Sequence, residues 1–174
     1  MAGGAPPTSV SGTSGNDDLQ AVIGGGGTVI AGGDGNDILR GGKFADFLVG
    51  GKGDDQMFGG AGGDQFRFFG DQIDGVDTDR IYDLNFGEGD SIVFGRFAAD
   101  FFSDDSGINA FTDGTAAQIT SIDGLRNLVE NSNGAITASQ RGSTDVLIVT
   151  IHSGENTQIL WLSNMWAAYN SELV

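Results

Sequence analysis

Apolar residues recur every nine positions in the first third of the chain, each set among glycines and aspartates. From Gly32 onward, four gap-free nonamers read GGDGNDILR, GGKFADFLV, GGKGDDQMF and GGAGGDQFR. Upstream, GTSGNDDLQ from Gly12 fits the same frame. Residues 23–31 form a degraded copy that follows a two-residue insertion, Ala21–Val22. A short fixed period of this kind predicts a repeat architecture.

The eighth position of each repeat predicts the core. It is occupied in turn by Leu19, Ile30, Leu39, Leu48, Met57 and Phe66. A disordered glycine-rich linker would not keep an apolar residue in phase over consecutive copies. We therefore expect short strands at 38–39, 47–48 and 57–58, with the eighth position facing a thin core.

The remaining positions of the nonamer predict a turn that binds a hard cation. Glycine at positions one, two and four permits the positive φ that a tight turn needs. Such a turn can aim the carbonyls of positions two and four, and the carboxylate of position six, at one cavity. Calcium takes six to eight oxygen ligands of these kinds. Because one turn supplies too few, we expect the ion between turns two repeats apart.

This geometry names the candidate calcium ligands. The expected carboxylate pairs are Asp37 with Asp55, Asp46 with Asp64, and Asp17 with Asp37. The expected carbonyl ligands are Gly33, Gly35, Gly42, Gly51, Gly53, Gly60 and Gly62. Two departures weaken the pattern: Phe44 replaces a fourth-position glycine, and Thr28 replaces an aspartate opposite Asp46. We expect two sound calcium sites and up to four in all.

The nonamer resembles the RTX repeat, GGxGxDxUx, of hemolysin-type calcium-binding proteins. The resemblance implies an all-β fold, a parallel β-roll (β-helix) in which each repeat gives a turn and a short strand. It also implies a secreted bacterial protein that folds on meeting extracellular calcium and serves type I secretion. An alternative is a calcium-stabilised adhesion or polysaccharide-binding module at a cell surface, similar to the repeat modules of alginate epimerases or to surface-layer proteins.

The segment after the repeats resembles the one that follows them in many RTX proteins. Its D-x-I-x-D-F-x-x-G-x-D-x-I pattern appears, with Phe86 displaced by one position, at Asp79, Ile81, Asp83, Phe86, Gly87, Asp90 and Ile92. The resemblance implies a cap on the roll and makes Asp79, Asp83 and Asp90 further candidate calcium ligands. The alternative is two strands, at 80–84 and 91–94, with acidic turns.

Beyond this segment the pattern predicts a β-rich C-terminal region with one short helix. Residues 95–117 look irregular, and Ser121 is expected to cap a helix through Leu125, Leu128 and Val129. Residues 145–152 and 157–163 read as a hairpin, followed by a short amphipathic turn and an acidic-apolar tail. The expected organisation is an N-terminal tail at 1–11, the roll at 12–70, and a capping region with a secretion signal at 71–174.

Composition narrows the function classes. The formal charge is −16, and 20 of the 24 acidic residues are aspartate, which suits turns and calcium ligation. This charge disfavours nucleic acid as a partner. The chain has no cysteine, and its single histidine, His152, is expected to be an ordinary strand residue. We find no catalytic motif and no apolar run long enough to span a membrane, so we expect a calcium-binding protein that is not an enzyme.

Overall fold

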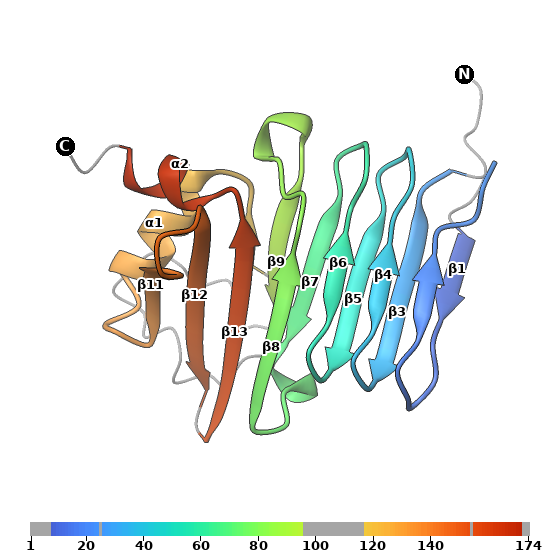
Figure 1. The fold of residues 1–174 in the computed structure, drawn as a ribbon, viewed down its shortest axis with the longest axis horizontal. Coiled ribbons are helices and arrows are strands. Elements are labelled where there is room, and N and C mark those ends of the chain that lie inside the picture. The colour runs from blue at the N-terminus through green and yellow to red at the C-terminus, as the bar shows by residue number, and fades with distance from the viewer. Residues whose placement is uncertain (1–7, 25, 96–116, 154, 172–174) are drawn as a thin grey trace.

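The computed structural model describes residues 8–24, 26–95, 117–153 and 155–171. Thirteen strands lie in these ranges: β1 (Thr8–Ser11), β2 (Asp18–Gln20), β3 (Thr28–Asp34), β4 (Ile38–Arg40), β5 (Phe47–Lys52), β6 (Gln56–Phe58), β7 (Gln65–Phe69), β8 (Val76–Ile81), β9 (Ser91–Gly95), β10 (Ala117–Ile119), β11 (Ile136–Gln140), β12 (Val146–Ser153) and β13 (Asn156–Ser163). Two α-helices, α1 (Ile122–Glu130) and α2 (Trp166–Asn170), lie at the C-terminal end (Figure 1). Short 3-10 turns occupy Gly70–Gln72 and Phe86–Glu88.

The strands form two sheets between which the repeats alternate. One sheet has the order β1-β3-β5-β7-β9-β10, and the other has the order β11-β12-β13-β8-β6-β4-β2. From β1 to β9 the paired neighbours are parallel, and each coil of the chain adds one strand to each sheet. The expected all-β parallel roll is therefore present, and Figure 1 shows its coils stacked side by side.

The register follows the nonamer. Leu39 pairs with Met57 and Leu48 with Phe66, so paired residues lie two repeats apart. At the first coil the offset grows to that between Leu19 and Leu39, because Ala21–Val22 adds two residues there. The insertion is thus absorbed in a loop without shifting the inward face.

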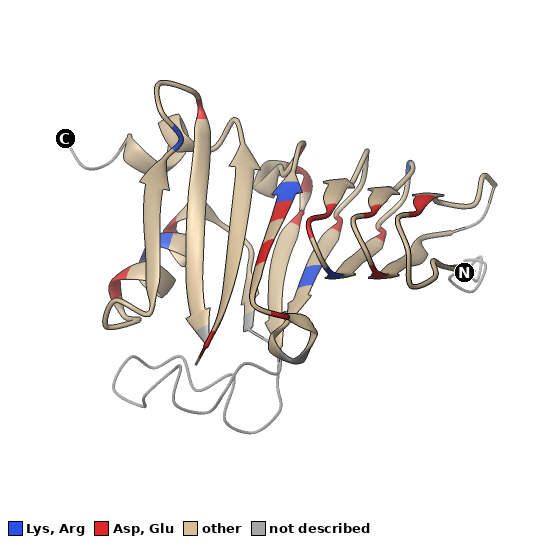
Figure 2. Cartoon of the chain, turned by 60° about the horizontal axis from the view of Figure 1, so that its bottom comes forward, with Lys and Arg blue, Asp and Glu red and all other residues tan. Residues whose placement is uncertain are grey.

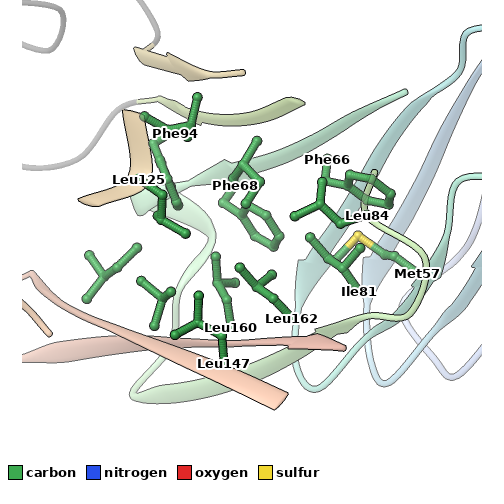
Figure 3. Packing of buried hydrophobic residues seen from close by; sticks show 14 of the residues in the cluster. Met57, Phe66, Phe68, Ile81, Leu84, Phe94, Leu125, Leu147, Leu160 and Leu162 are labelled. Carbon is green, nitrogen blue, oxygen red and sulfur yellow. The ribbon is translucent and has the colours of Figure 1, made fainter. Parts of the chain in front are cut away.

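The eighth-position side chains make the core of the roll, as predicted. Ile30, Leu39, Leu48, Met57 and Phe66 are all fully buried, whereas Leu19, in the first coil, is only partly buried against the same cluster. Ile81 and Ile92 continue this row beyond the repeats, and the same apolar cluster runs on to the leucines under the C-terminal strands (Figure 3). The core of the roll and the core of the C-terminal region are therefore continuous.

The C-terminal region contains the expected elements and some unexpected ones. The Ser121 hydroxyl caps α1 by accepting the Gly124 N–H, and β12 and β13 form the expected antiparallel hairpin. A second helix, α2, stands where only a turn was expected, and β10 and β11 were not foreseen. Of the irregular connection expected at 95–117, residues 96–116 lie outside the described residues.

Two boundaries also differ from expectation. Residues 8–11, assigned to the N-terminal tail, form β1, because the N–H and C=O groups at the edge of β3 accept one further parallel strand. The strand expected at 80–84 is β8, which begins at Val76 and ends at Ile81. It begins earlier because Asp77 and Asp79 point inward at alternate positions and continue the strand toward the turn.

Candidate calcium-binding turns

The sixth-position residues of the repeats, together with two aspartates that follow the repeats, stack into two rows, one along each edge of the roll. We call them the first ladder (Asp17, Asp37, Asp55, Asp79) and the second ladder (Thr28, Asp46, Asp64, Asp90). In each row the Oδ1 atom of one aspartate accepts the backbone N–H of the preceding member, at 2.6–2.9 Å. The acidic residues, red in Figure 2, accordingly recur along the turns.

The ladders extend past the nonamers. Asp79 and Asp90, which lie in the segment after the repeats, accept the N–H groups of Asp55 and Asp64 at 2.9 Å each. Asp83 lies outside both ladders: its two oxygens accept the Gly59 and Gly60 N–H groups at 2.9 and 3.0 Å. The structure therefore places the Asp83 carboxylate against the backbone of the turn at 59–64, apart from the two ladders, and its expected role as a calcium ligand stays a prediction.

Glycine conformation separates the turns into two kinds. Gly33 and Gly35 have φ of 116° and 113°, and the turns at 50–55 and 59–64 repeat this pattern. In the turn at 41–46, by contrast, neither Gly42 nor Phe44 has positive φ. The distortion expected from Phe44 is thus seen, because a residue with a Cβ disfavours the left-handed region that a fourth-position glycine adopts.

The first-position glycines serve a purpose other than the one we predicted. None of Gly32, Gly41, Gly50 and Gly59 has positive φ, so the expectation of positive φ at position one is wrong. A Cβ atom at Gly50 would overlap the Oδ2 atom of Asp55, and one at Gly32 would overlap that of Asp37. Glycine is needed here because the carboxylate lies directly against the backbone.

The second carboxylate oxygen shows which turns are open to a cation. The Oδ2 atoms of Asp37, Asp55 and Asp64 are buried without a hydrogen-bond partner, and all three belong to turns with two positive-φ glycines. In the other turns this oxygen is already bonded: Asp46 Oδ2 accepts the Gly42 N–H at 2.6 Å, and Asp17 Oδ2 accepts the Thr13 N–H at 2.6 Å. A buried carboxylate oxygen without a donor fits a cation, because only a proton or a positive charge can offset its lost hydration.

The family comparison agrees with this geometry. Residues 31–66 match the model of the RTX calcium-binding nonapeptide repeat, in four copies. These turns are RTX calcium-binding repeats. No curated protein matches the chain. The matched residues hold all three unpartnered carboxylate oxygens, whereas the turn at 12–17 and the ends of both ladders lie outside the match.

Burial raises the pKa of most of the ladder aspartates. Desolvation, reinforced by neighbouring carboxylates, raises the pKa of Asp55 to about 7 and that of Asp64 to about 6. The same cause raises the pKa of Asp37 and, well above its usual range, that of Asp79. Within the described ranges the ion pairs are Arg40–Asp18 and Arg126–Asp123, so no basic side chain neutralises a ladder there.

Each turn pair brings only two carboxylates together. Among the described residues no group of three or more acidic or histidine side chains could hold a metal. The remaining calcium ligands would have to be backbone carbonyls, as the repeat predicts for Gly33, Gly35, Gly51 and Gly53 in the turns of Asp37 and Asp55. Gly42, another predicted carbonyl ligand, has its oxygen accepting the Ala61 N–H at 3.0 Å. The ligand assignments themselves stay predictions.

The structure adds two residues that the sequence did not single out. Asp77 is buried beside Asp79 on β8, and the alternation in Val-Asp-Thr-Asp was a signal for it. Gln158, on β13, donates from its Nε2 to Asp79 Oδ2 at 2.9 Å, with both side chains buried. No sequence signal links these two positions, which lie 79 residues apart.

Proposed function

We propose that this chain is a calcium-folded, non-catalytic module of a secreted bacterial protein, exported by a type I system. The observation that supports this is the set of three buried, unpartnered carboxylate oxygens in the RTX turns. Without a cation these charges destabilise the compact roll, because each is removed from water without compensation. With calcium bound, the binding free energy becomes folding free energy.

The proposed mechanism couples this requirement to export. Inside a cell free calcium is low, so the repelling aspartates keep the repeats unfolded, which suits passage through a narrow channel. Outside, calcium near the millimolar range matches the affinity of about 10⁻⁴–10⁻³ M of extracellular calcium modules. The roll then folds after it has left the cell.

We further propose that the region after residue 70 caps the roll and starts its folding. β8 and β9 pair with β6 and β7, the last strands of the repeats, and β13, from far along the sequence, pairs in parallel with β8. The apolar cluster is continuous across this junction. A preformed C-terminal end would offer the adjoining repeat an edge on which to pair.

Neither helix of the described residues has the length and the apolar composition that a membrane-spanning helix needs.

The test is a calcium titration of the chelated protein followed by far-UV circular dichroism, with magnesium as the control. We expect a cooperative gain of β-structure near millimolar calcium that magnesium does not produce. A matched substitution at an exposed aspartate of the same turn, Asp34→Asn, should leave the midpoint unchanged, whereas Asp37→Ala should raise it. A spectrum that is already β-rich in chelator and insensitive to calcium would contradict the proposal.

A further inference from the structure

The edge of the roll that carries the first ladder, the first edge, has a second row of side chains that links its turns. We call it the fifth-position row, because its members Asn16, Asn36 and Asp54 hold the fifth position of their repeats. Asn16 Oδ1 accepts the Asn36 N–H at 2.9 Å, and Asn36 Oδ1 accepts the Asp54 N–H at 3.1 Å. Asp54 Oδ1 then accepts the Thr78 N–H at 2.8 Å. All three side chains are exposed, so the row adds hydrogen bonds without adding core packing.

The fifth-position row runs in the opposite direction to the first ladder. In the ladder each carboxylate accepts an N–H from the preceding turn, as Asp55 Oδ1 does from Asp37 at 2.8 Å. In the fifth-position row each side chain accepts an N–H from the turn that follows. Neighbouring turns of the first edge are therefore joined by two bonds of opposite direction, one at position five and one at position six.

The bond at position five fixes the peptide group that carries the fourth-position carbonyl. The Gly35 carbonyl and the Asn36 N–H belong to one planar trans peptide, in which the two groups point in opposite directions. Because this N–H points back to Asn16, the Gly35 oxygen points forward to the turn at 50–55. A Cβ atom at Gly53 would accordingly lie 2.5 Å from the Gly35 oxygen and 2.9 Å from its carbonyl carbon. The oxygen, a predicted calcium ligand, thus leads toward the next turn.

Peptide groups without this bond are oriented differently. On the second edge the fifth-position residues are Gly27, Ala45 and Gly63, which offer no side-chain acceptor. A Cβ atom at Gly62 would lie 2.7, 2.8 and 2.9 Å from the carbon, oxygen and nitrogen of the Phe44–Ala45 peptide. This peptide therefore presents its flat face, and not its oxygen, to the following turn. Gly27 cannot be replaced by an acceptor, since a Cβ atom there would overlap the Ala45 carbonyl oxygen.

The first turn of the first edge shows the same orientation as the second edge. The Asn16 N–H forms no hydrogen bond in the described part of the chain, because no earlier turn of this edge lies there. A Cβ atom at Gly35 would lie 2.7 Å from the carbonyl carbon of Gly15, 3.0 Å from its oxygen and 3.0 Å from the Asn16 nitrogen. The orientation of the fourth-position carbonyl therefore follows the bond at position five, whichever edge carries the turn.

We infer that Asn16 and Asn36 are positioning residues for calcium binding. Each accepts the N–H of the following fifth position and so turns a fourth-position carbonyl toward the next turn, where the ion is predicted: Asn16 acts on Gly35, and Asn36 acts on Gly53. This inference deepens the proposed function and rests on it, because the carbonyls are ligands only if the turns bind calcium. It also ranks the edges: the first edge should bind calcium more tightly than the second.

The test compares the whole chain with its Asn16→Ala variant. Calcium titrations followed by circular dichroism give the affinity. Luminescence lifetimes of bound terbium, a hard cation used in place of calcium, give the number of water molecules on the ions when recorded in light and heavy water. We expect calcium affinity to fall about fivefold, the effect of about one net hydrogen bond. We also expect additional water on terbium, because water replaces the Gly35 carbonyl once its peptide group is free to turn.

Two further variants serve as controls. Asn16→Asp keeps the Oδ1 acceptor, and Asp54 shows that an aspartate at this position can accept the next N–H. It should therefore retain the affinity and the water count of the parent chain. Ser14→Ala shortens another exposed side chain of the same turn, one that forms no hydrogen bond within the described residues, and it should change neither quantity.

The outcomes separate this inference from the proposed function. A parent chain without a calcium transition would overturn both. If the parent chain folds with calcium but Asn16→Ala keeps its affinity and water count, the inference alone fails. It also fails if affinity falls while the water count stays the same, because the bond would then stabilise the turn without orienting a ligand. An equal loss in Asn16→Asp or in Ser14→Ala would likewise contradict it, since the acceptor would then not be the cause.

Discussion

The two edges of the roll carry the same repeat but differ in how their carboxylates are used. The first ladder contains two unpartnered buried oxygens, on Asp37 and Asp55, whereas the second contains one, on Asp64. The second ladder begins at Thr28, and its next member, Asp46, is bonded to the Gly42 N–H of its own turn. A turn without its glycine pair thus closes on itself and satisfies its aspartate internally.

The ends of the ladders differ as well. The first ends at Asp79, whose second oxygen accepts the Gln158 side-chain amide from β13. The second ends at Asp90, whose second oxygen accepts the backbone N–H of Asn85, five residues away. One edge is therefore completed by a distant strand and the other by its own loop. This difference implies that the first edge depends more on the C-terminal hairpin.

The largest effect should come from removing an unpartnered carboxylate and comparing it with a bonded one. Asp55→Ala and Asp46→Ala each leave one buried backbone N–H of the preceding ladder member unbonded, which costs about 1–3 kcal/mol. Asp46→Ala additionally frees the Gly42 N–H of its own turn. Only Asp55→Ala also removes an oxygen open to calcium. We expect the calcium concentration at the folding midpoint to rise about tenfold more for Asp55→Ala than for Asp46→Ala, as measured by circular dichroism titration. Equal midpoints would show that the free oxygens do not distinguish the turns.

The second-largest effect should come from removing the side-chain donor at the end of the first ladder. Gln158→Leu leaves the buried Asp79 carboxylate without its side-chain donor, so we expect a loss of about 1–3 kcal/mol in unfolding free energy. Denaturant unfolding in saturating calcium measures it. The control is Gln140→Leu, which removes an exposed hydrogen bond to the Thr144 carbonyl and should cost little. If both variants lose the same stability, Gln158 does not link the hairpin to the ladder.

Features set by residues close together in the sequence were predicted, whereas features set by contacts between distant segments were not. The phase of Leu39, Met57 and Phe66 is local and repeated, so the core, the register and the stacking of aspartates followed from it. The helix cap at Ser121 is local too. The contact of Gln158 with Asp79 depends on β13 lying beside β8, which no periodicity encodes. The closed carboxylate of Asp46 depends on a backbone direction that only the structure reveals.

Lowering the pH should favour folding in chelator, but it should weaken calcium binding when calcium is present. Burial raises the pKa of Asp55 to about 7, from an ordinary value of 3.8. A raised folded-state pKa means that protonation favours folding: the stabilisation is complete below pH 3.8 and is lost as pH rises through 7. In chelator, the β-structure measured by far-UV circular dichroism should therefore increase as the pH falls from 8 toward 4. In calcium, protons compete with the ion, and the apparent calcium affinity should fall over the same range.

The variant Asp55→Ala supplies the control for this pH dependence. In chelator its β-structure should increase less between pH 8 and pH 4 than that of the parent chain, because one carboxyl with a raised pKa is gone. The remaining slope belongs to groups such as Asp64, whose pKa is raised to about 6. A parent chain whose chelated form becomes less stable on acidification would contradict the assignment of buried, uncompensated carboxylates to the folded state.

The smallest effect should come from opening the turn at 41–46, whose aspartate is bonded within its own turn. Phe44→Gly returns the fourth-position glycine, so the turn at 41–46 can adopt the positive φ of its neighbours and release Asp46 Oδ2 from the Gly42 N–H. Phe44 is half exposed, so its loss removes little core packing. We expect one additional calcium ion by calorimetric stoichiometry and a modest fall in the folding midpoint. Phe44→Ala is the matched control, because it removes the ring but keeps a Cβ, and its stoichiometry should not change. An unchanged ion count in Phe44→Gly would mean that Thr28, which offers no carboxylate opposite Asp46, keeps this turn pair closed on its own.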